Sequence, residues 1–305
     1  MSGILLQTHG LTKQYGRHKA VDHVDLHIKK GAIYRFIGRN GAGKTTCLRM
    51  ISGLASPTEG EISMFGRQGK DLREVRSRIG CLIEAPGLYG NMTAYENLKI
   101  KCRFFGIRTP GYIEDILDTV GLKDVGKKRT KHFSLGMKQR LGIGLALVGE
   151  PDLLVLDEPI NGLDPQGIAE VRDTIQALRD QRNMTVLISS HILEELSKIA
   201  TDYGIIHNGV LLQEMTREEL MKRCSERIEI TLDQPEAALP ILDEMGFAHY
   251  QVTDRHHIHV FERLEESDVL NMALAKAEIP VRGISITSQE LENYFLNLTE
   301  GASHV

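Results

Sequence analysis

Hydrophobic and polar residues follow two kinds of pattern along the first two-thirds of the chain. Residues 4–37 alternate with the two-residue period of strands, as in Val-Asp-His-Val-Asp-Leu-His-Ile from Val21 to Ile28. Four segments are nearly continuous in apolar residues, as buried parallel strands are. They span residues 32–37, 79–83, 153–157 and 185–189. Segments with the periodicity of helices separate these strands. We therefore expect an α/β fold that has a mostly parallel sheet and an antiparallel β part at its N-terminus.

Three successive helices are predicted between the second and third of these strands. The first begins with a capping box formed by Thr93 and Glu96. The second opens at Pro110, and the third begins at the N-cap residue Ser134. We therefore expect a helical subdomain, at about residues 88–148, inserted into the α/β domain.

The pattern changes after about Cys224. Short strands at 228–232, 258–260 and 284–286 alternate with helices at 236–247, 267–277 and 288–298. Just before this change, Asn208-Gly209 predicts the turn of a hairpin. We expect two domains, a nucleotide-binding domain at residues 1–220 and a small α+β accessory domain at residues 221–305.

One segment between a predicted strand and a predicted helix fits the phosphate-binding motif G-x-x-x-x-G-K-[ST]. It reads Gly38-Arg39-Asn40-Gly41-Ala42-Gly43-Lys44-Thr45-Thr46. Its glycines allow tight turns that direct backbone N–H groups at one anion, and the helix N-terminus adds partial positive charge. Lys44 would reach the β- and γ-phosphates, and the Thr45 hydroxyl would bind Mg²⁺. A glycine-rich turn with a chance lysine is disfavoured by the flanking strand and helix, so this P-loop predicts binding of a nucleoside triphosphate.

Two acidic residues, Asp157 and Glu158, end the apolar strand Leu153–Leu156. A carboxylate at the end of a central strand beside a P-loop is suited to hold Mg²⁺, which gives Asp157 a role. Glu158 is suited to act as the base that orients and deprotonates the attacking water. Strands often end in acids without any function, but the P-loop upstream favours the catalytic interpretation.

The order of P-loop, helical block, Ser-x-Gly helix start and Asp-Glu strand resembles the ATP-binding-cassette (ABC) ATPases over roughly residues 4–215. The family's signature loop, Leu-Ser-Gly-Gly-Gln, is matched by Phe133 followed by Ser134, Leu135, Gly136 and Met137. The serine and the second glycine are kept, whereas Leu135 and Met137 depart from the pattern. The resemblance implies that this loop contacts the γ-phosphate held by the P-loop of a second subunit.

Further positions take their roles from the same resemblance. Tyr15 corresponds to the aromatic residue that stacks on adenine. The alternative is that Tyr15 is a tyrosine of the hydrophobic core. Glu84 stands where the family has the glutamine of the Q-loop, so we expect it near Mg²⁺ with altered metal affinity. Asn161 and Asp164 correspond to the D-loop, and Asp164 also reads as a helix N-cap. His191 corresponds to the switch histidine, which hydrogen-bonds the γ-phosphate.

The variant Q-loop, the Ser-Leu-Gly-Met-Lys-Gln-Arg signature and the short C-terminal tail further resemble the bacitracin and lantibiotic export ATPases. This implies ATP and Mg²⁺ as cofactors, an ATP-dependent homodimer, and an integral-membrane permease that docks at roughly Glu84 to Phe105. The expected function is to energise export of an antimicrobial peptide, antibiotic or similar amphipathic compound. Arg35 departs from this group, which has a small residue in that place of the P-loop strand.

Composition adds few constraints. The chain has 305 residues, a net charge of −4 and 4 cysteines without a C-x-x-C pair, so we expect neither a nucleic-acid partner nor a zinc site. Its most apolar run, residues 141–149, is too short for a membrane span, so we expect a cytoplasmic protein, peripheral on the inner face of the membrane. A soluble ABC ATPase that serves as a conformational switch is the alternative.

Two clusters outside these motifs have simpler interpretations. His256, His257 and His259 look metal-like, but only the last two share a strand face, so we expect a solvated face. The basic run from Lys127 to Lys131 predicts a solvated loop that could meet acidic lipid or a permease.

Overall fold

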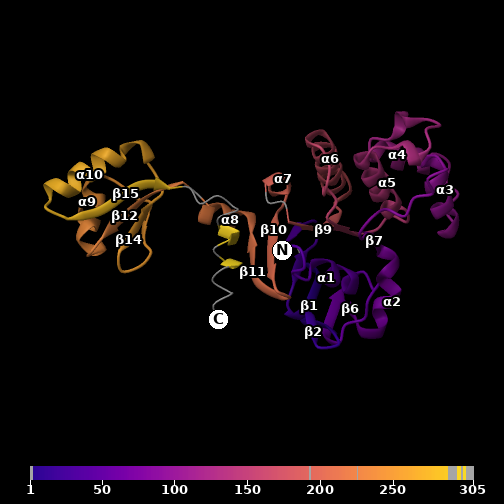
Figure 1. Cartoon of the computed structure of the whole chain (residues 1–305), viewed down its shortest axis with the longest axis horizontal. Coiled ribbons are helices and arrows are strands. Elements are labelled where there is room, and N and C mark those ends of the chain that lie inside the picture. The colour runs from indigo at the N-terminus through magenta and orange to yellow at the C-terminus, as the bar shows by residue number, and fades with distance from the viewer. Residues whose placement is uncertain (1–2, 192–193, 225, 288–293, 297, 300–305) are drawn as a thin grey trace. The chain divides into compact units, whose positions relative to one another are not determined.

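A computed structural model describes residues 3–191, 194–224, 226–287, 294–296 and 298–299. The chain forms two compact units, Met1–Arg217 and Glu218–Val305 (Figure 1). Within the described residues, no helix combines the length and the apolar character that crossing a membrane requires.

The first unit is built on a six-stranded sheet with the strand order β11-β10-β4-β9-β8-β7. The strands are β4 (Ile33–Ile37), β7 (Ile79–Leu82), β8 (Leu153–Asp157), β9 (Thr185–Ser190), β10 (Asp202–His207) and β11 (Val210–Thr216). Every neighbouring pair is parallel except β10 and β11. That pair is joined at Asn208-Gly209, where both residues have positive φ as a tight hairpin turn requires. The expected mostly parallel sheet is confirmed.

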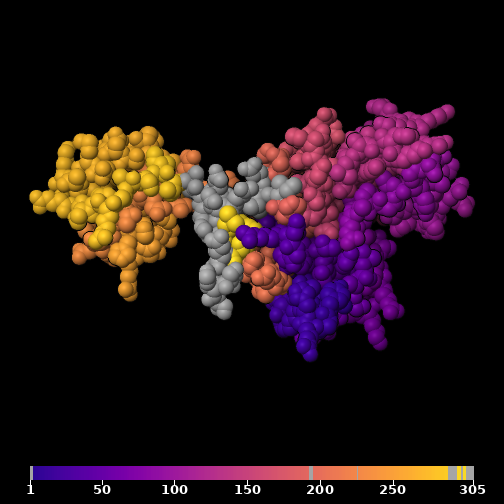
Figure 2. Space-filling view, viewed as in Figure 1, coloured from indigo at the N-terminus to yellow at the C-terminus, as the bar shows by residue number. Residues whose placement is uncertain are grey.

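An antiparallel sheet precedes and flanks the P-loop helix α1 (Lys44–Ile51). It consists of β1 (Ile4–Tyr15), β2 (His18–Val24), β3 (His27–Lys29), β5 (Glu59–Met64) and β6 (Arg67–Gln68). Its apolar side chains share one core with α1 and one face of the main sheet. A short helix, α2 (Leu72–Val75), follows it. Figure 2 shows this part in indigo below the helical block, which is purple to magenta.

The helical block consists of α3 (Ala94–Phe104), α4 (Tyr112–Thr119) and α5 (Leu135–Leu147). The capping box of α3 is present, because Thr93 Oγ1 accepts from Glu96 N and Glu96 Oε2 accepts from Thr93 N. Helix α4 begins two residues after Pro110, since Gly111 takes a left-handed φ of 80° as its N-cap. The block shares a second core with the other face of the main sheet, which α6 (Pro165–Arg182) and α7 (Glu194–Ser197) also cover.

The second unit contains a four-stranded antiparallel sheet with the order β13-β14-β12-β15. The strands are β12 (Arg227–Leu232), β13 (Tyr250–Val252), β14 (His257–Val260) and β15 (Val281–Thr287), and the helices are α8 (Arg217–Cys224), α9 (Leu239–Glu244) and α10 (Ser267–Lys276). The helix predicted at 236–247 forms in part, as a 3₁₀ turn, Pro235–Ala238, followed by α9, which ends at Glu244. Pro240 lacks a backbone N–H, so it suits only the first turn of a helix. Strand β13 and helix α8 were not predicted, and most of the helix expected at 288–298 lies outside the described residues.

Arg35, which departs from the resembled group, lies on β4 between β9 and β10 and is fully buried. Burial lowers the pKa of its guanidinium to about 10, against the opposing effects of Tyr203 and Glu158. The side chain thus places a buried positive charge close enough to interact with the predicted catalytic carboxylate.

Candidate nucleotide-binding site

The predicted catalytic residues converge at one edge of the main sheet. The P-loop follows β4, Asp157 ends β8 and Glu158 comes next, and His191 follows β9. These three strands are neighbours and parallel, so their carboxyl ends meet. Ligands of open α/β sheets bind at this edge.

The P-loop has the backbone geometry that only glycine adopts without strain. Gly41 and Gly43 have φ of 82° and 105°. A Cβ on Gly43 would lie 2.4 Å from Ala20 O, and one on Gly38 would lie 2.6 Å from Ile206 O. Both glycines are therefore required for close approach of neighbouring backbone, and Gly43 also for its conformation.

Lys44 is held at the centre of the site. Its Nζ donates to Gly38 O at 2.6 Å and to Arg39 O at 3.2 Å. The same atom lies 3.1 Å from Glu158 Oε1, and both side chains are largely buried. Lys44 thus links the P-loop to Glu158 just after β8. When a nucleotide binds, its ammonium can pair with a phosphate oxygen in place of the Glu158 carboxylate.

Thr45 and Asp157 supply two adjacent oxygen atoms of the kind that Mg²⁺ prefers. Thr45 Oγ1 donates to Asp157 Oδ2 at 2.8 Å. The other carboxylate oxygen, Oδ1, accepts from Ser189 Oγ at 2.6 Å. Ser189 lies opposite Asp157 on β9 and is fully buried, so it fixes the orientation of the carboxylate.

Glu158 is held by contacts to β9, to His191 just after it and to Lys44 of α1. Its φ is 49°, a left-handed conformation that is costly for a residue with a side chain. Its backbone N–H is shared between Ser189 Oγ at 2.9 Å and Ser189 O at 3.2 Å. Its Oε2 lies 2.8 Å from Nδ1 of His191. The carboxylate therefore sits between Lys44 and His191, where a base that acts beside a γ-phosphate would need to be.

These residues fit MgATP by their chemistry. Backbone N–H groups and Lys44 can receive phosphate oxygens, and Thr45 and Asp157 can hold a divalent cation. Glu158 and His191 form a hydrogen-bonded pair that can act on a water or a phosphate oxygen.

The remaining predicted residues lie around this centre. Tyr15 pairs with His18 on β2 and is half exposed, with Lys13 Nζ 5.1 Å from its ring centroid, so one side of the ring is available for stacking. Glu84, also at positive φ, pairs with the guanidinium of Arg49 in the last turn of α1. Mg²⁺ and Arg49 would compete for this exposed carboxylate.

The signature and the D-loop lie against each other within the chain. Ser134 Oγ accepts from Met137 N at 3.2 Å as the N-cap of α5. A Cβ on Gly162 would lie 3.4 Å from Leu135, and one on Gly136 would lie 3.9 Å from Leu163. Asn161 N donates to Glu158 O at 3.1 Å, which links the D-loop to the predicted base. The predicted cap also forms, as Asp164 Oδ1 accepts from Gly167 N at 3.1 Å.

Ser189 is the functional candidate that sequence reasoning missed. The segment containing it was predicted as a strand, but no role was given to its hydroxyl. The available signal was a polar residue near the end of an apolar strand. It indicates a role beside Asp157 only if β8 and β9 are known to pair.

Comparison with known proteins extends the resemblance to the whole chain. The sequence profile of the ABC transporter family matches residues 21–161. The bacitracin transport ATP-binding protein BcrA of Bacillus licheniformis is 44% identical over 98% of both chains. BcrA of Enterococcus faecalis is 39% identical over 97% of both chains. The lantibiotic transport ATP-binding protein SrtF of Streptococcus pyogenes is 43% identical over 69% of this chain and 90% of its own.

Solved structures agree with the fold. An ATP-binding subunit of an ABC transporter, 30% identical, superposes with a TM-score of 0.62 over 72% of this chain and 92% of its own. CbiO1 of Clostridium perfringens, 23% identical, superposes with a TM-score of 0.65 over 72% and 91%. The predicted ABC ATPase fold and the resemblance to the bacitracin and lantibiotic group are both confirmed. The chain belongs to the family of ABC transporter ATP-binding proteins.

Proposed function

We propose that this chain binds and hydrolyses MgATP, and that hydrolysis drives export of an antimicrobial peptide or similar amphipathic compound through a separate permease. The observation that carries the ATPase proposal is the convergence of Lys44, Thr45, Asp157, Glu158 and His191 within hydrogen-bonding distances. The names of the bacitracin and lantibiotic relatives support the transport role and the class of cargo.

In this proposal each residue of the site has one task. Lys44 leaves Glu158 and binds phosphate oxygens, which frees the Glu158 carboxylate to accept a proton from water. Ser189 keeps Asp157 turned toward Thr45, and the oxygens of Asp157 and Thr45 would hold the Mg²⁺, which would neutralise phosphate charge. His191 remains hydrogen-bonded to Glu158 and contacts the γ-phosphate.

The far side of the γ-phosphate requires donors that the P-loop does not supply. The N-terminus of α5, with Ser134 and Gly136, offers a hydroxyl and backbone N–H groups suited to an anion. We infer that a second copy of the chain supplies them, so that two ATP molecules lie in a two-fold dimer interface. ATP then stabilises the dimer and hydrolysis releases it.

The permease is proposed to dock beside the Q-loop and the helical block, on the inner face of the membrane. Leu54, Tyr89 and Phe104 line a cavity of about 370 Å³ there, and their exposed fractions are 63%, 56% and 86%. Phe104 is on α3, and Cys81 and Leu82 of β7 also line the cavity. Large apolar side chains with such exposure suit the apolar end of a partner helix.

Two variants test the proposal in cells that carry the gene. Lys44→Ala should sensitise them to bacitracin or a lantibiotic, whereas the control Lys70→Ala, at an exposed lysine in the turn Gly69–Asp71, should not. Phe104→Ser should retain ATP binding but lose co-purification with the permease from solubilised membranes. Unchanged resistance in Lys44→Ala cells, with no membrane protein co-purifying, would instead support the soluble switch.

A further inference from the structure

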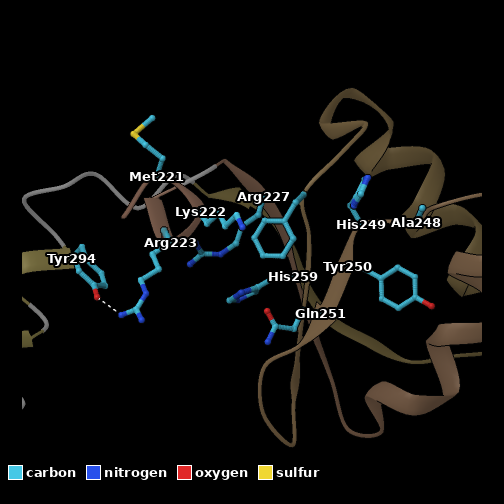
Figure 3. A pocket seen from close by; sticks show the side chains of 11 residues that line it. Met221, Lys222, Arg223, Arg227, Ala248, His249, Tyr250, Gln251, His259 and Tyr294 are labelled. Carbon is cyan, nitrogen blue, oxygen red and sulfur yellow. Dashed lines mark hydrogen bonds between the residues drawn. The ribbon is translucent and has the colours of Figure 1, made fainter. Parts of the chain in front are cut away.

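The second unit contains a cavity of about 1040 Å³ that no step of ATP hydrolysis uses (Figure 3). It is bordered by α8, by the starts of β12 and β13, by β14 and by Tyr294. Its volume is at the upper end of the range for sites that bind small organic molecules.

The cavity lies on the face of the four-stranded sheet that the core does not use. Ile228 and Ile230 of β12, with Ile258 and Val260 of β14, pack into the core with α9 and α10. Because side chains alternate along strands, Arg227 and His259 point to the opposite face. The histidine pattern predicts a solvated face, but the side chain of His259 is only 18% exposed and lines this cavity.

The cavity is rich in positive charge. Lys222 and Arg223 of α8 and Arg227 of β12 all line it. The side chain of Arg227 is 13% exposed, and its nearest carboxylate oxygen, Glu229 Oε2, is 3.9 Å from Nη2. Glu229 also lies 3.6 Å from His259 Nε2, so one carboxylate serves two groups.

The guanidinium of Arg227 has few close hydrogen-bond acceptors for a buried cation. Its Nη1 makes a long hydrogen bond of 3.5 Å to Arg223 O. Its Nε is buried, and the described part of the chain offers it no hydrogen-bond acceptor. A buried cation normally gains close acceptors, because desolvating it without them is costly. An anionic ligand would supply what is missing.

The other walls favour a ligand with an aromatic or apolar part. Phe261 lies edge-on to His259, with ring centroids 6.2 Å apart. Arg223 Nη1 donates to Tyr294 Oη at 2.6 Å, which fixes that guanidinium at one end of the cavity, as Figure 3 shows. Burial and then the charge of Arg227 lower the pKa of His259, which agrees with a positive potential on this face.

We propose that this cavity is a binding site for a small organic anion. Its phosphate or carboxylate group pairs with Arg227 and Arg223, and its aromatic or apolar part contacts Phe261 and Tyr294. The site would give the accessory domain a ligand of its own, separate from ATP.

Calorimetric titration of the full chain with phenyl phosphate, benzoate and inorganic phosphate tests this proposal. Saturating ADP and Mg²⁺ must be present, so that the P-loop does not bind the probes. We expect one site per chain that binds phenyl phosphate or benzoate more tightly than inorganic phosphate. The tighter of the two organic probes identifies the preferred head group.

Matched variants locate the site. Arg227→Gln and Arg223→Gln should each weaken binding of the organic anion about tenfold or more, as loss of a charge-assisted hydrogen bond does. Phe261→Ala should weaken the organic probes but not inorganic phosphate. Arg282→Gln is the control, since Arg282 is exposed on β15 and pairs with Asp233. Absence of binding by both organic probes, or equal binding by wild type and both arginine variants, would overturn the proposal.

Discussion

Replacing Ser189 by alanine tests whether the magnesium-binding geometry is fixed by β9. The hydroxyl of Ser189 is fully buried, donates to Asp157 Oδ1 at 2.6 Å and accepts from Glu158 N at 2.9 Å. Ser189→Ala removes both bonds. Glu158 N retains Ser189 O at 3.2 Å, whereas the Asp157 oxygen loses the partner that orients it.

The expected loss of stability follows from the charge of the acceptor. A hydrogen bond to a charged group contributes about 1.5–3 kcal/mol. For a unit of this size, about 2 kcal/mol lowers the melting temperature by about 4–8 °C. Loss of a residue that orients a metal ligand also lowers metal affinity about 10- to 100-fold. Ser189→Ala should therefore need at least about tenfold more Mg²⁺ for half-maximal ATP hydrolysis.

The assay is thermal unfolding followed by circular dichroism, together with the ATPase rate as a function of Mg²⁺ concentration. Thr8→Val is the matched control, because Thr8 is fully buried and its hydroxyl bonds Val24 O and Leu26 N, neither of which belongs to the site. It should lower the melting temperature but leave the Mg²⁺ requirement unchanged. If Ser189→Ala melts like wild type and needs no more Mg²⁺, then Ser189 does not fix the orientation of Asp157.

Three further predictions concern the P-loop and the residues around it. Gly43→Ala should abolish ATP binding measured by calorimetry, because its Cβ would lie 2.4 Å from Ala20 O, whereas Gly41→Ala, with nothing within 4 Å, should weaken binding less. Tyr15→Ala should weaken ATP binding by about 1–3 kcal/mol, the contribution of base stacking, while Tyr15→Phe should bind ATP as wild type does. If Tyr15→Ala binds ATP as tightly as wild type, the ring does not stack on adenine. Glu84→Gln should leave the melting temperature unchanged, since exposed ion pairs contribute little, but should raise the Mg²⁺ requirement of ATP hydrolysis; an unchanged requirement would rule out Glu84 as a metal ligand.

Much of the nucleotide-binding unit could be predicted because its signals are local. The P-loop, the capping box at Thr93 and the N-caps Ser134 and Asp164 depend on residues a few positions apart, and the structure contains each of these local elements. The apolar strands could be predicted for the same reason, because a strand that is buried on both faces consists of consecutive apolar residues.

The features that sequence reasoning missed depend on pairing between distant strands and helices. The role of Ser189 follows from the register of β8 with β9, and the ion pair of Glu84 follows from the position of Arg49 on α1. In the second unit, β13 is three residues long and exists because it pairs with β14. The charge of the cavity likewise comes from segments that only the fold brings together.

In the proposed mechanism, Glu158 is the base of an ATPase that works as an ATP-dependent dimer. ATP turnover and oligomeric state should be measured for purified wild type and Glu158→Gln in the presence of MgATP. We expect wild type to hydrolyse ATP, and the variant to be about 10²- to 10⁴-fold slower and to accumulate as a dimer with trapped ATP. A variant that hydrolyses ATP like wild type and remains monomeric with ATP would contradict it.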